Sequence, residues 1–168
     1  MKKLIGILLV AAVFASCQTQ KKQVFTTSAE IDMVKKLDQS FAGSDWSTFR
    51  ASFSDTAKIW INTSWSDPAM SADTLTQNFK TARAGLTAIR MNDNAIYNMV
   101  EHDNGARWVH RWLVWESTNT NGKSATWTSN ANFLIADGKI VQAGYIYNAL
   151  PGYLANQPDP APAAAPAK

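Results

Sequence analysis

The sequence predicts an α+β fold in which helices cover a curved, largely antiparallel sheet. Three segments with strand-like alternation follow one another at 107–117, 124–135 and 139–148. Turn residues separate them, with Asn121-Gly122 in the first connection and Asp137-Gly138 in the second. Such pairs are strong hairpin signals, because glycine, asparagine and aspartate adopt a positive φ at low cost. The observations together predict a three-stranded meander packed against the helices that precede it.

Helical spacing predicts the elements that cover this sheet. A first helix over 27–43 and a third over 71–85 carry apolar side chains three and four positions apart, and a short second helix begins at Ser44 or Asp45. In the first helix the repeating residues are Ile31, Val34, Leu37 and Phe41. These apolar faces are expected to pack on the sheet.

Two further strand-like segments complete the domain. Residues 58–62 alternate in the manner of a strand, and 87–102 are strand-like but interrupted by Asn92-Asp93-Asn94. An interruption of this kind is typical of a bend in a long curved strand.

The start of the chain has the features of a bacterial export signal. Met1 is followed by two lysines and an apolar run over 4–14, which is short for a membrane span. The chain's only cysteine, Cys17, follows Phe14-Ala15-Ser16. This arrangement resembles a lipobox, in which the cysteine is lipidated and becomes the first residue of the mature protein. A simple secretory peptide and an uncleaved anchor are the alternatives.

These features predict four regions: a lipoprotein signal peptide over 1–16, a lipidated tether over 17–26, a folded domain over 27–153, and a disordered Pro/Ala tail over 154–168. The expected location is the bacterial cell envelope, with the protein anchored through Cys17. Gln18 after that cysteine favours the outer membrane, facing the periplasm.

Charge and motifs exclude several classes of function. Removing Lys2 and Lys3 from the 16 basic residues leaves 14 against 13 acidic ones, so no excess of positive charge favours nucleic acid. No glycine-rich phosphate loop is present, and no cofactor is expected. No metal site is expected either, because the neighbours Glu101-His102-Asp103 would point to opposite faces of a strand or lie in a turn.

Three stretches resemble the nuclear-transport-factor-2-like (NTF2-like) superfamily, in particular its SnoaL-like and ketosteroid-isomerase-like branch. They are Ala42–Trp46, Phe53–Ile59 and Phe133–Val141, and the resemblance extends over about residues 27–150. It implies a cone in which a curved mixed or antiparallel sheet wraps around the N-terminal helices and encloses a central pocket. It also implies a homodimer that forms through the outer face of the sheet. Members include isomerases, cyclases and dehydratases as well as noncatalytic binding domains.

Alternation sorts the strand residues into two faces without deciding which face lines the pocket. We expect the face with Trp108, His110 and Trp112 to line it. A histidine between tryptophans suits general acid–base catalysis, although a half-buried or interface histidine is the alternative. The other ligand-binding candidates are Trp60, Asn62, Tyr145 and Tyr147.

Two carboxylates are candidates to assist His110. Chemistry of the ketosteroid-isomerase kind needs a carboxylate base and an oxyanion hole made by a tyrosine and a protonated acid. Asp67 follows the strand over 58–62, and Glu116 shares the face of His110. Neither lies in a motif that matches the catalytic aspartates of the family. A turn-forming role for Asp67 and a solvated position for Glu116 are the alternatives.

Two functions remain open at this point. The first is a lipid-anchored module that binds a small apolar or amphipathic ligand in its pocket. The second is a SnoaL-like isomerase, cyclase or dehydratase with His110 as its acid or base. The second requires His110, Asp67 and a tyrosine hydroxyl to meet in one cavity.

Overall fold

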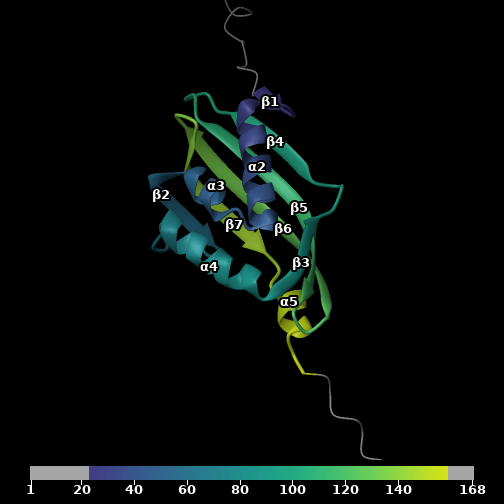
Figure 1. Cartoon of the computed structure of the whole chain (residues 1–168). Coiled ribbons are helices and arrows are strands. Elements are labelled where there is room, and N and C mark those ends of the chain that lie inside the picture. The colour runs from purple at the N-terminus through teal and green to yellow at the C-terminus, as the bar shows by residue number, and fades with distance from the viewer. Residues whose placement is uncertain (1–22, 159–168) are drawn as a thin grey trace, which may run out of the picture.

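A curved seven-stranded sheet organises the computed structural model, which describes residues 23–158 (Figure 1). Its strand order is β1-β4-β5-β6-β7-β2, and β3 also pairs with β5. The strands are β1 (Gln23–Phe25), β2 (Phe53–Ile61), β3 (Leu86–Met91), β4 (Ile96–Glu101), β5 (Arg107–Asn119), β6 (Ser124–Ala136) and β7 (Lys139–Tyr147).

The pairing confirms the predicted meander and the predicted mixed sheet. β5, β6 and β7 pair antiparallel in sequence order, whereas β2 lies parallel to β7. β3 and β4 lie one after the other along β5, with Met91 opposite Trp115 and Ile96 opposite Trp112. The predicted interruption therefore divides one line of pairing into two strands, and β5 continues through the bend.

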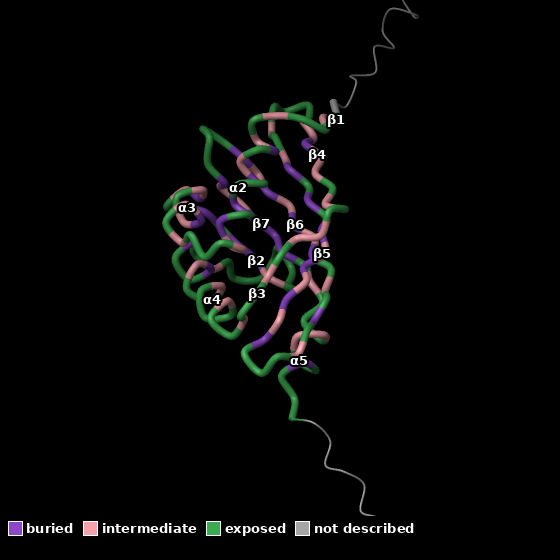
Figure 2. The backbone as a smooth tube through the Cα atoms, turned by 45° about the vertical axis from the view of Figure 1, so that its right-hand side comes forward, coloured by how far each residue is buried: buried purple, intermediate pink, exposed green. Residues whose placement is uncertain are grey.

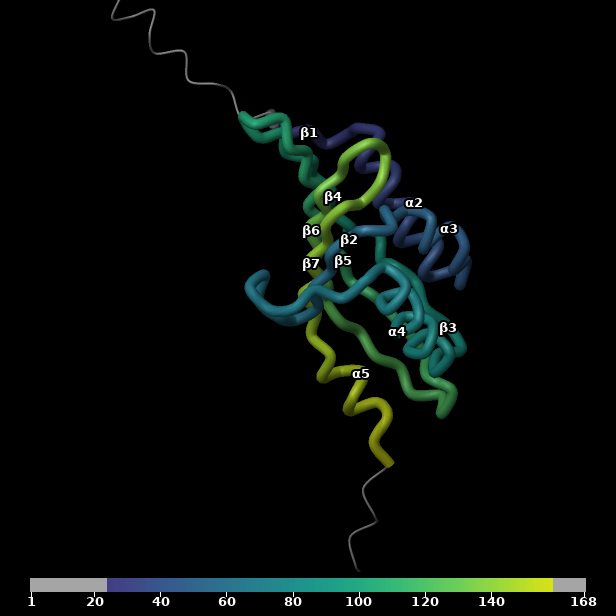
Figure 3. Tube along the Cα trace, turned by 90° about the vertical axis from the view of Figure 1, so that its left-hand side faces the viewer, coloured from purple at the N-terminus to yellow at the C-terminus, as the bar shows by residue number. Residues whose placement is uncertain are grey.

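Helices cover one face of this sheet (Figures 1 and 3). α2 (Ala29–Gly43), α3 (Trp46–Ala51) and α4 (Ala72–Ala84) precede the meander, and α5 (Leu150–Ala155) follows it. Side chains that accept a backbone N–H begin the first three helices: Ser28 for α2, Asp45 for α3 and Ser71 for α4. The α+β class is confirmed.

The hydrophobic core lies between these helices and the inner face of the sheet (Figure 2). Ile31 and Val34 of α2 are fully buried, as are Val109 of β5 and Phe133 of β6. Complete burial of one such side chain stabilises the fold by about 1.5–3 kcal/mol. The helical periodicity of α2 and the alternation of the strands therefore meet in one core.

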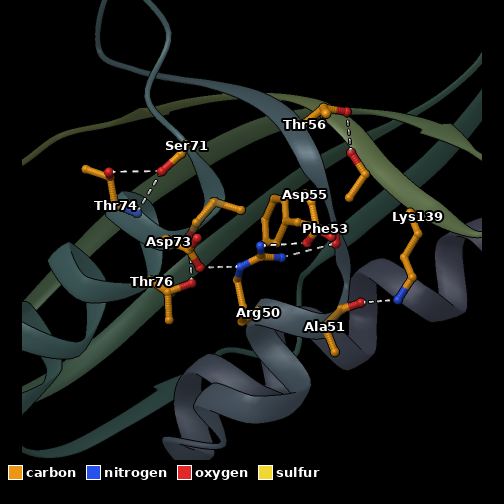
Figure 4. A network of polar contacts seen from close by, with 12 residues as sticks. Arg50, Ala51, Phe53, Asp55, Thr56, Ser71, Asp73, Thr74, Thr76 and Lys139 are labelled. Carbon is orange, nitrogen blue, oxygen red and sulfur yellow. Dashed lines mark hydrogen bonds and ion pairs between the residues drawn. The ribbon is translucent and has the colours of Figure 1, made fainter.

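Arg50 ties α3 to its neighbours at the edge of the sheet (Figure 4). Its Nε donates to Asp73 of α4 at 2.6 Å, and its Nη2 donates to Asp55 of β2 at 2.9 Å. Lys139 at the start of β7 donates to the carbonyl of Ala51. Arg50 thus links α3, α4 and β2, which are separate in the sequence.

The folded region extends beyond the predicted limits of 27–153. Residues 23–25, which the sequence placed in the tether, form β1 and pair with β4, with Val24 opposite Val100. Three residues are too few to carry an alternating pattern, and the partner strand is distant in sequence. α5 likewise extends to Ala155, past the predicted limit. The sequence did not predict this helix, because six residues are too few to show a helical period.

Other predicted features lie outside the described residues. These are the signal peptide over 1–16, the lipidated Cys17 and most of the Pro/Ala tail. Within residues 23–158, no helix has the length and apolar character needed to cross a bilayer.

Candidate functional site: a cavity beneath the helices

A cavity of about 220 Å³ lies between the inner face of the sheet and the helices. The inner face is the one that carries the odd-numbered residues of β5, β6 and β7 around the cavity. Strand residues in its lining are Arg111, Trp115, Ser117, Asn119, Trp127, Ser129, Tyr145 and Tyr147. Leu86 at the start of β3 also lines it, and helices and connections add Asp38, Phe41, Phe49, Phe79, Ala82, Asn148, Ala149, Gly152 and Asn156.

Seven aromatic side chains line the cavity. Phe41 of α2 packs edge-on against Phe79 of α4 at 5.3 Å and against Trp115 of β5 at 5.2 Å between ring centroids. Phe79 also meets the ring of Tyr145 at 5.6 Å. Such pairs are rigid and apolar, so the wall favours a flat apolar group.

A buried ion pair forms the polar part of the cavity. Arg111 Nη1 of β5 donates to Asp38 Oδ1 of α2 at 2.6 Å, and their side chains are 2% and 5% exposed. The Tyr97 hydroxyl donates to Asp38 Oδ2 at 2.9 Å, and Arg111 Nη2 donates to Ser129 Oγ at 2.9 Å. The two opposite charges compensate each other, so this part of the cavity suits a neutral ligand better than an ion.

Burial controls protonation here. It raises the pKa of the Asp38 carboxyl, while the charge of Arg111 and the hydrogen bond from Tyr97 oppose that rise. Burial also raises the pKa of Tyr97, with the nearby Asp38 charge adding to the effect, so its hydroxyl remains a donor. Burial also raises the pKa of Tyr145.

Two buried polar atoms beside this ion pair lack a partner among the described residues. They are Arg111 Nε, which is a donor, and the Tyr145 hydroxyl, which can donate or accept. An unpaired buried polar atom costs about 1–3 kcal/mol. A ligand with a carbonyl or hydroxyl oxygen could recover part of that cost.

Amide side chains and α5 surround the other end of the cavity. Asn119 at the end of β5 donates to Asn156 after α5 at 3.0 Å, and Asn121 donates to the carbonyl of Ala155 at 2.9 Å. Gly152 of α5 and Ala149, just before this helix, line the cavity. α5 is therefore a wall of the cavity that hydrogen bonds attach to the β5–β6 hairpin.

The face chosen from the sequence is the wrong one. Trp108, His110 and Trp112 lie on the outer face of β5, away from the cavity, and Trp112 is 57% exposed. His110 Nδ1 contacts Asn132 Oδ1 at 2.7 Å across the same outer face. Alternation gave the correct sets of side chains. The helices, however, cover the set that contains Arg111 and Trp115.

Trp60 also lies on the outer side of the sheet. Its ring packs against Trp65 at 4.6 Å, and Trp65 meets Trp108 at 5.9 Å. Trp60 Nε1 donates to the carbonyl of Asp67, and both residues line a separate, open groove at the edge of the sheet. The loop between β2 and α4 that carries Trp65 projects on this side (Figure 3).

The remaining candidates have local partners. The Asp67 carboxylate accepts from Thr63 and from the backbone N–H of Ser64, which lowers the pKa of Asp67. Asn62 accepts from the backbone of Tyr147, extending the pairing of β2 with β7.

Glu116 forms an ion pair with Arg90 on the outer face. His110, Asp67 and Glu116 therefore do not meet in one cavity. Tyr145 and Tyr147 do line the cavity.

Sequence reasoning missed Asp38 and Arg111, although a signal for both is present. Asp38 stands four positions after Val34 and three before Phe41, inside the apolar stripe of the first helix. Arg111 stands between Val109 and Leu113 on an otherwise apolar strand face. A charge inside each of two apolar stripes, with opposite signs, indicates a buried pair.

Metal-ligand side chains do not gather in the part of the chain described. Among residues 23–158, no three of the types histidine, cysteine, aspartate and glutamate come together in a way that could hold an ion.

Comparison with solved structures places the fold. The chain is similar to a candidate polyketide cyclase from Streptomyces antibioticus, with 16% identity, a TM-score of 0.59, and coverage of 76% of this chain and 98% of that one. It is also similar to a candidate polyketide cyclase from Xanthomonas campestris, with 17% identity, a TM-score of 0.55, and coverage of 71% of this chain and 90% of that one. An NTF2-like protein from Anabaena variabilis is similar as well, with 14% identity, a TM-score of 0.54, and coverage of 70% of this chain and 84% of that one.

No protein-family model matches the sequence, and no curated protein matches it either. The likeness therefore lies in the arrangement of the elements: a curved mixed sheet wrapped around helices, with a cavity between them. The chain has the NTF2-like fold.

Proposed function

We propose that this domain binds a small apolar or amphipathic molecule in the cavity beneath its helices. One observation supports the proposal above all others: an aromatic cavity of about 220 Å³ ends at a compensated ion pair flanked by two unpaired polar atoms. An aromatic wall gives apolar contact area, and a few fixed polar groups give orientation. The ligand class is a neutral, flat molecule with one carbonyl or hydroxyl group.

A neutral fluorescent probe tests this proposal. N-phenyl-1-naphthylamine is expected to bind the protein with one site and to be displaced by apolar compounds of similar size. Ala82→Trp would fill the cavity from α4, because Ala82 is part of its lining. Ala84→Trp is the matched control, since Ala84 is exposed on the same helix, as Ala82 is, but lies outside that lining. Equal probe binding by the two variants contradicts the proposal.

A second function has its own supporting observation. Asp38 is a carboxyl in the cavity lining, and burial raises its pKa, which moves it toward the range that suits acid–base catalysis. The similar structures include candidate polyketide cyclases. On this alternative the domain is a SnoaL-like isomerase, cyclase or dehydratase, with Asp38 in the acid–base role first assigned to His110.

The enzyme alternative predicts a change of the bound molecule. An oligoketide incubated with the protein should give a cyclised isomer of unchanged mass, separated by liquid chromatography and identified by NMR. Asp38→Asn should stop this conversion while probe binding continues, and His110→Ala should leave it unchanged. Conversion by Asp38→Asn at the parent rate rules out the assigned role.

We further propose the anchoring expected from the sequence, whose residues lie outside the described part. The signal over 1–16 directs export, Cys17 is lipidated, and the domain stays on the outer membrane facing the periplasm. Cys17→Ser should move the protein from the membrane fraction to the soluble fraction and abolish incorporation of labelled palmitate. Retention in the membrane would favour an uncleaved anchor.

The outer face of the sheet supports the proposed homodimer. Ile96 of β4, Trp112 of β5 and Ile146 of β7 lie in one row, with Asn130 of β6 between the last two. The three apolar side chains are 56%, 57% and 59% exposed. Large exposed apolar side chains on one face typically mark an interface. Trp112→Glu should convert a dimer into a monomer in sedimentation analysis, whereas Tyr153→Glu on α5 should not.

A further inference from the structure

Trp65 is held in one position on the outer side of the sheet while much of it stays exposed. Its ring packs against Trp60 at 4.6 Å and against Trp108 at 5.9 Å between ring centroids. It also lies over Gly144, where a Cβ atom would come within 2.7 Å of the ring. Trp65 is nevertheless 47% exposed, and its indole N–H has no hydrogen-bond partner among residues 23–158. A ring that its neighbours already immobilise loses little further freedom when a ligand stacks on it.

The loop that carries Trp65 forms one side of the open groove at the edge of the sheet, which has a volume of about 490 Å³. The lining combines aromatic rings with charged and hydroxyl side chains. Its members include Trp60, Trp65, Asp55, Lys58, Asp67 and Ser71. This mixture differs from the aromatic cavity beneath the helices, and it suits a ligand that has both an apolar face and several polar groups.

Two charged side chains of the groove have unused hydrogen-bonding capacity. Asp67 accepts from the Thr63 hydroxyl and the Ser64 N–H through Oδ2 alone, so its Oδ1 has no partner in the described part of the chain. These two bonds lower the pKa of Asp67, so the carboxylate remains an acceptor. Lys58 is exposed and has neither an ion pair nor a hydrogen bond to any described residue. The groove thus offers an acceptor and a donor beside the indole of Trp65.

The charges of the groove favour a neutral ligand that carries hydroxyl groups. Asp55 pairs with Arg50 at 2.9 Å, and Lys58 balances the charge of Asp67, so neither sign dominates. An anion would meet two carboxylates. A purely apolar molecule would displace water from the charged groups without replacing its hydrogen bonds. A hydroxyl group, in contrast, can donate to a carboxylate and accept from an ammonium group.

The edge of β2 beside the groove is not free to pair with an extended peptide. The Ile59 N–H donates to the Met70 carbonyl at 3.1 Å, and the Met70 N–H donates to the Ile59 carbonyl at 2.9 Å. A peptide that adds a strand to a sheet needs such backbone groups. A pyranose ring needs none of them, because its C–H face packs on an indole and its hydroxyl groups point outward around the ring.

We propose that this groove binds a neutral oligosaccharide, with one pyranose ring stacked on Trp65 and its hydroxyl groups bonded to Asp67 and Lys58. The groove shares no lining residue with the cavity beneath the helices. Sugar binding therefore does not depend on what that cavity holds.

Calorimetric titration with maltotriose, cellotriose and chitotriose tests the site on the full chain. At least one of these sugars should bind with a dissociation constant of about 1 mM or below. Saturation-transfer NMR should show magnetisation passing from aromatic protons of the protein to ring C–H protons of the bound sugar. Trp65→Ala should weaken this binding at least about tenfold, because it removes the stacking surface.

The matched control is Tyr153→Ala, because Tyr153 is an exposed aromatic residue on α5 that lies outside the groove. It should leave the affinity for the sugar unchanged. Lys58→Ala removes a hydrogen-bond donor without disturbing a contact of the described residues, and it should weaken binding about threefold. If Trp65→Ala also lowers the melting temperature, Lys58→Ala decides the test, since an affinity equal to that of the parent would then overturn the site.

Three other results would also overturn the site: no binding of any of the three sugars by the parent, unchanged affinity in Trp65→Ala, or an equal loss in Tyr153→Ala. The naphthylamine probe is titrated on the same samples with and without sugar. Displacement of the sugar by the probe would place the sugar in the cavity beneath the helices and contradict the groove. Failure of the groove site and failure of the cavity function are thus read separately.

Discussion

Arg111 on β5 and Asp38 on α2 form an ion pair at 2.6 Å, across 73 residues of sequence, with both side chains almost completely buried. The pair lies where the first helix meets the middle of the sheet. Each charge is tolerated because the other compensates it and because Tyr97 and Ser129 supply further hydrogen bonds. The same two residues therefore contribute to the stability of the fold and form the polar part of the cavity.

Replacing one member of this pair should lower the free energy of unfolding more than replacing both members together. Asp38→Leu alone and Arg111→Met alone should each lower the free energy of unfolding by about 3–5 kcal/mol, because each leaves one buried charge uncompensated. The double variant should lose much less than the sum of the two. Urea denaturation of the four proteins measures this cycle, and additive losses would mean that the two charges do not depend on each other.

The burial of Asp38 also predicts how the stability of the fold depends on pH. Burial raises the pKa of Asp38 above its value in the unfolded chain. Between these two pKa values the folded protein therefore binds more protons than the unfolded one, and this contribution to stability falls as pH rises. Asp38→Asn removes the titration, so the difference in unfolding free energy between parent and variant should shift in the parent's favour at low pH. A difference that is constant across acidic pH contradicts the raised pKa.

Gly144 on β7 leaves room for Trp65. A Cβ at position 144 would lie 2.7 Å from Trp65 Cζ2, closer than carbon atoms approach. Gly144→Ala should therefore displace Trp65 from its contact with Trp60, change the near-ultraviolet circular dichroism of the coupled indoles, and cost about 1–3 kcal/mol. In a Trp65→Ala background the same substitution should have little effect. A full cost in that background would assign the effect to the strand itself.

His110 should contribute little to stability or to cavity binding. Its side chain is exposed on the outer face and contacts Asn132 there. His110→Ala is therefore expected to change the free energy of unfolding by no more than about 0.5 kcal/mol and to leave the affinity for the naphthylamine probe unchanged. Thermal melting and a probe titration check both expectations. A loss of probe affinity would connect the outer face to the cavity.

The sequence by itself determined the order of the elements, the two hairpins, the interrupted strand and the two sets of side chains on each strand. Those features depend on local backbone preferences and on the periods of apolar residues, which neighbours in the sequence report. The same periods predicted the class of fold and, with the resemblance, a central pocket.

The tertiary structure alone decided which face of the sheet encloses the cavity. A period of two separates Trp108, His110 and Trp112 from Arg111 and Trp115 but is symmetric between the faces. The helices pack on only one of the two faces, the one that carries Arg111 and Trp115. α2 placed Asp38 opposite Arg111, and a buried cation is stable only where a carboxylate from another element reaches it. That contact joins residues distant in the sequence, so only the folded chain shows it.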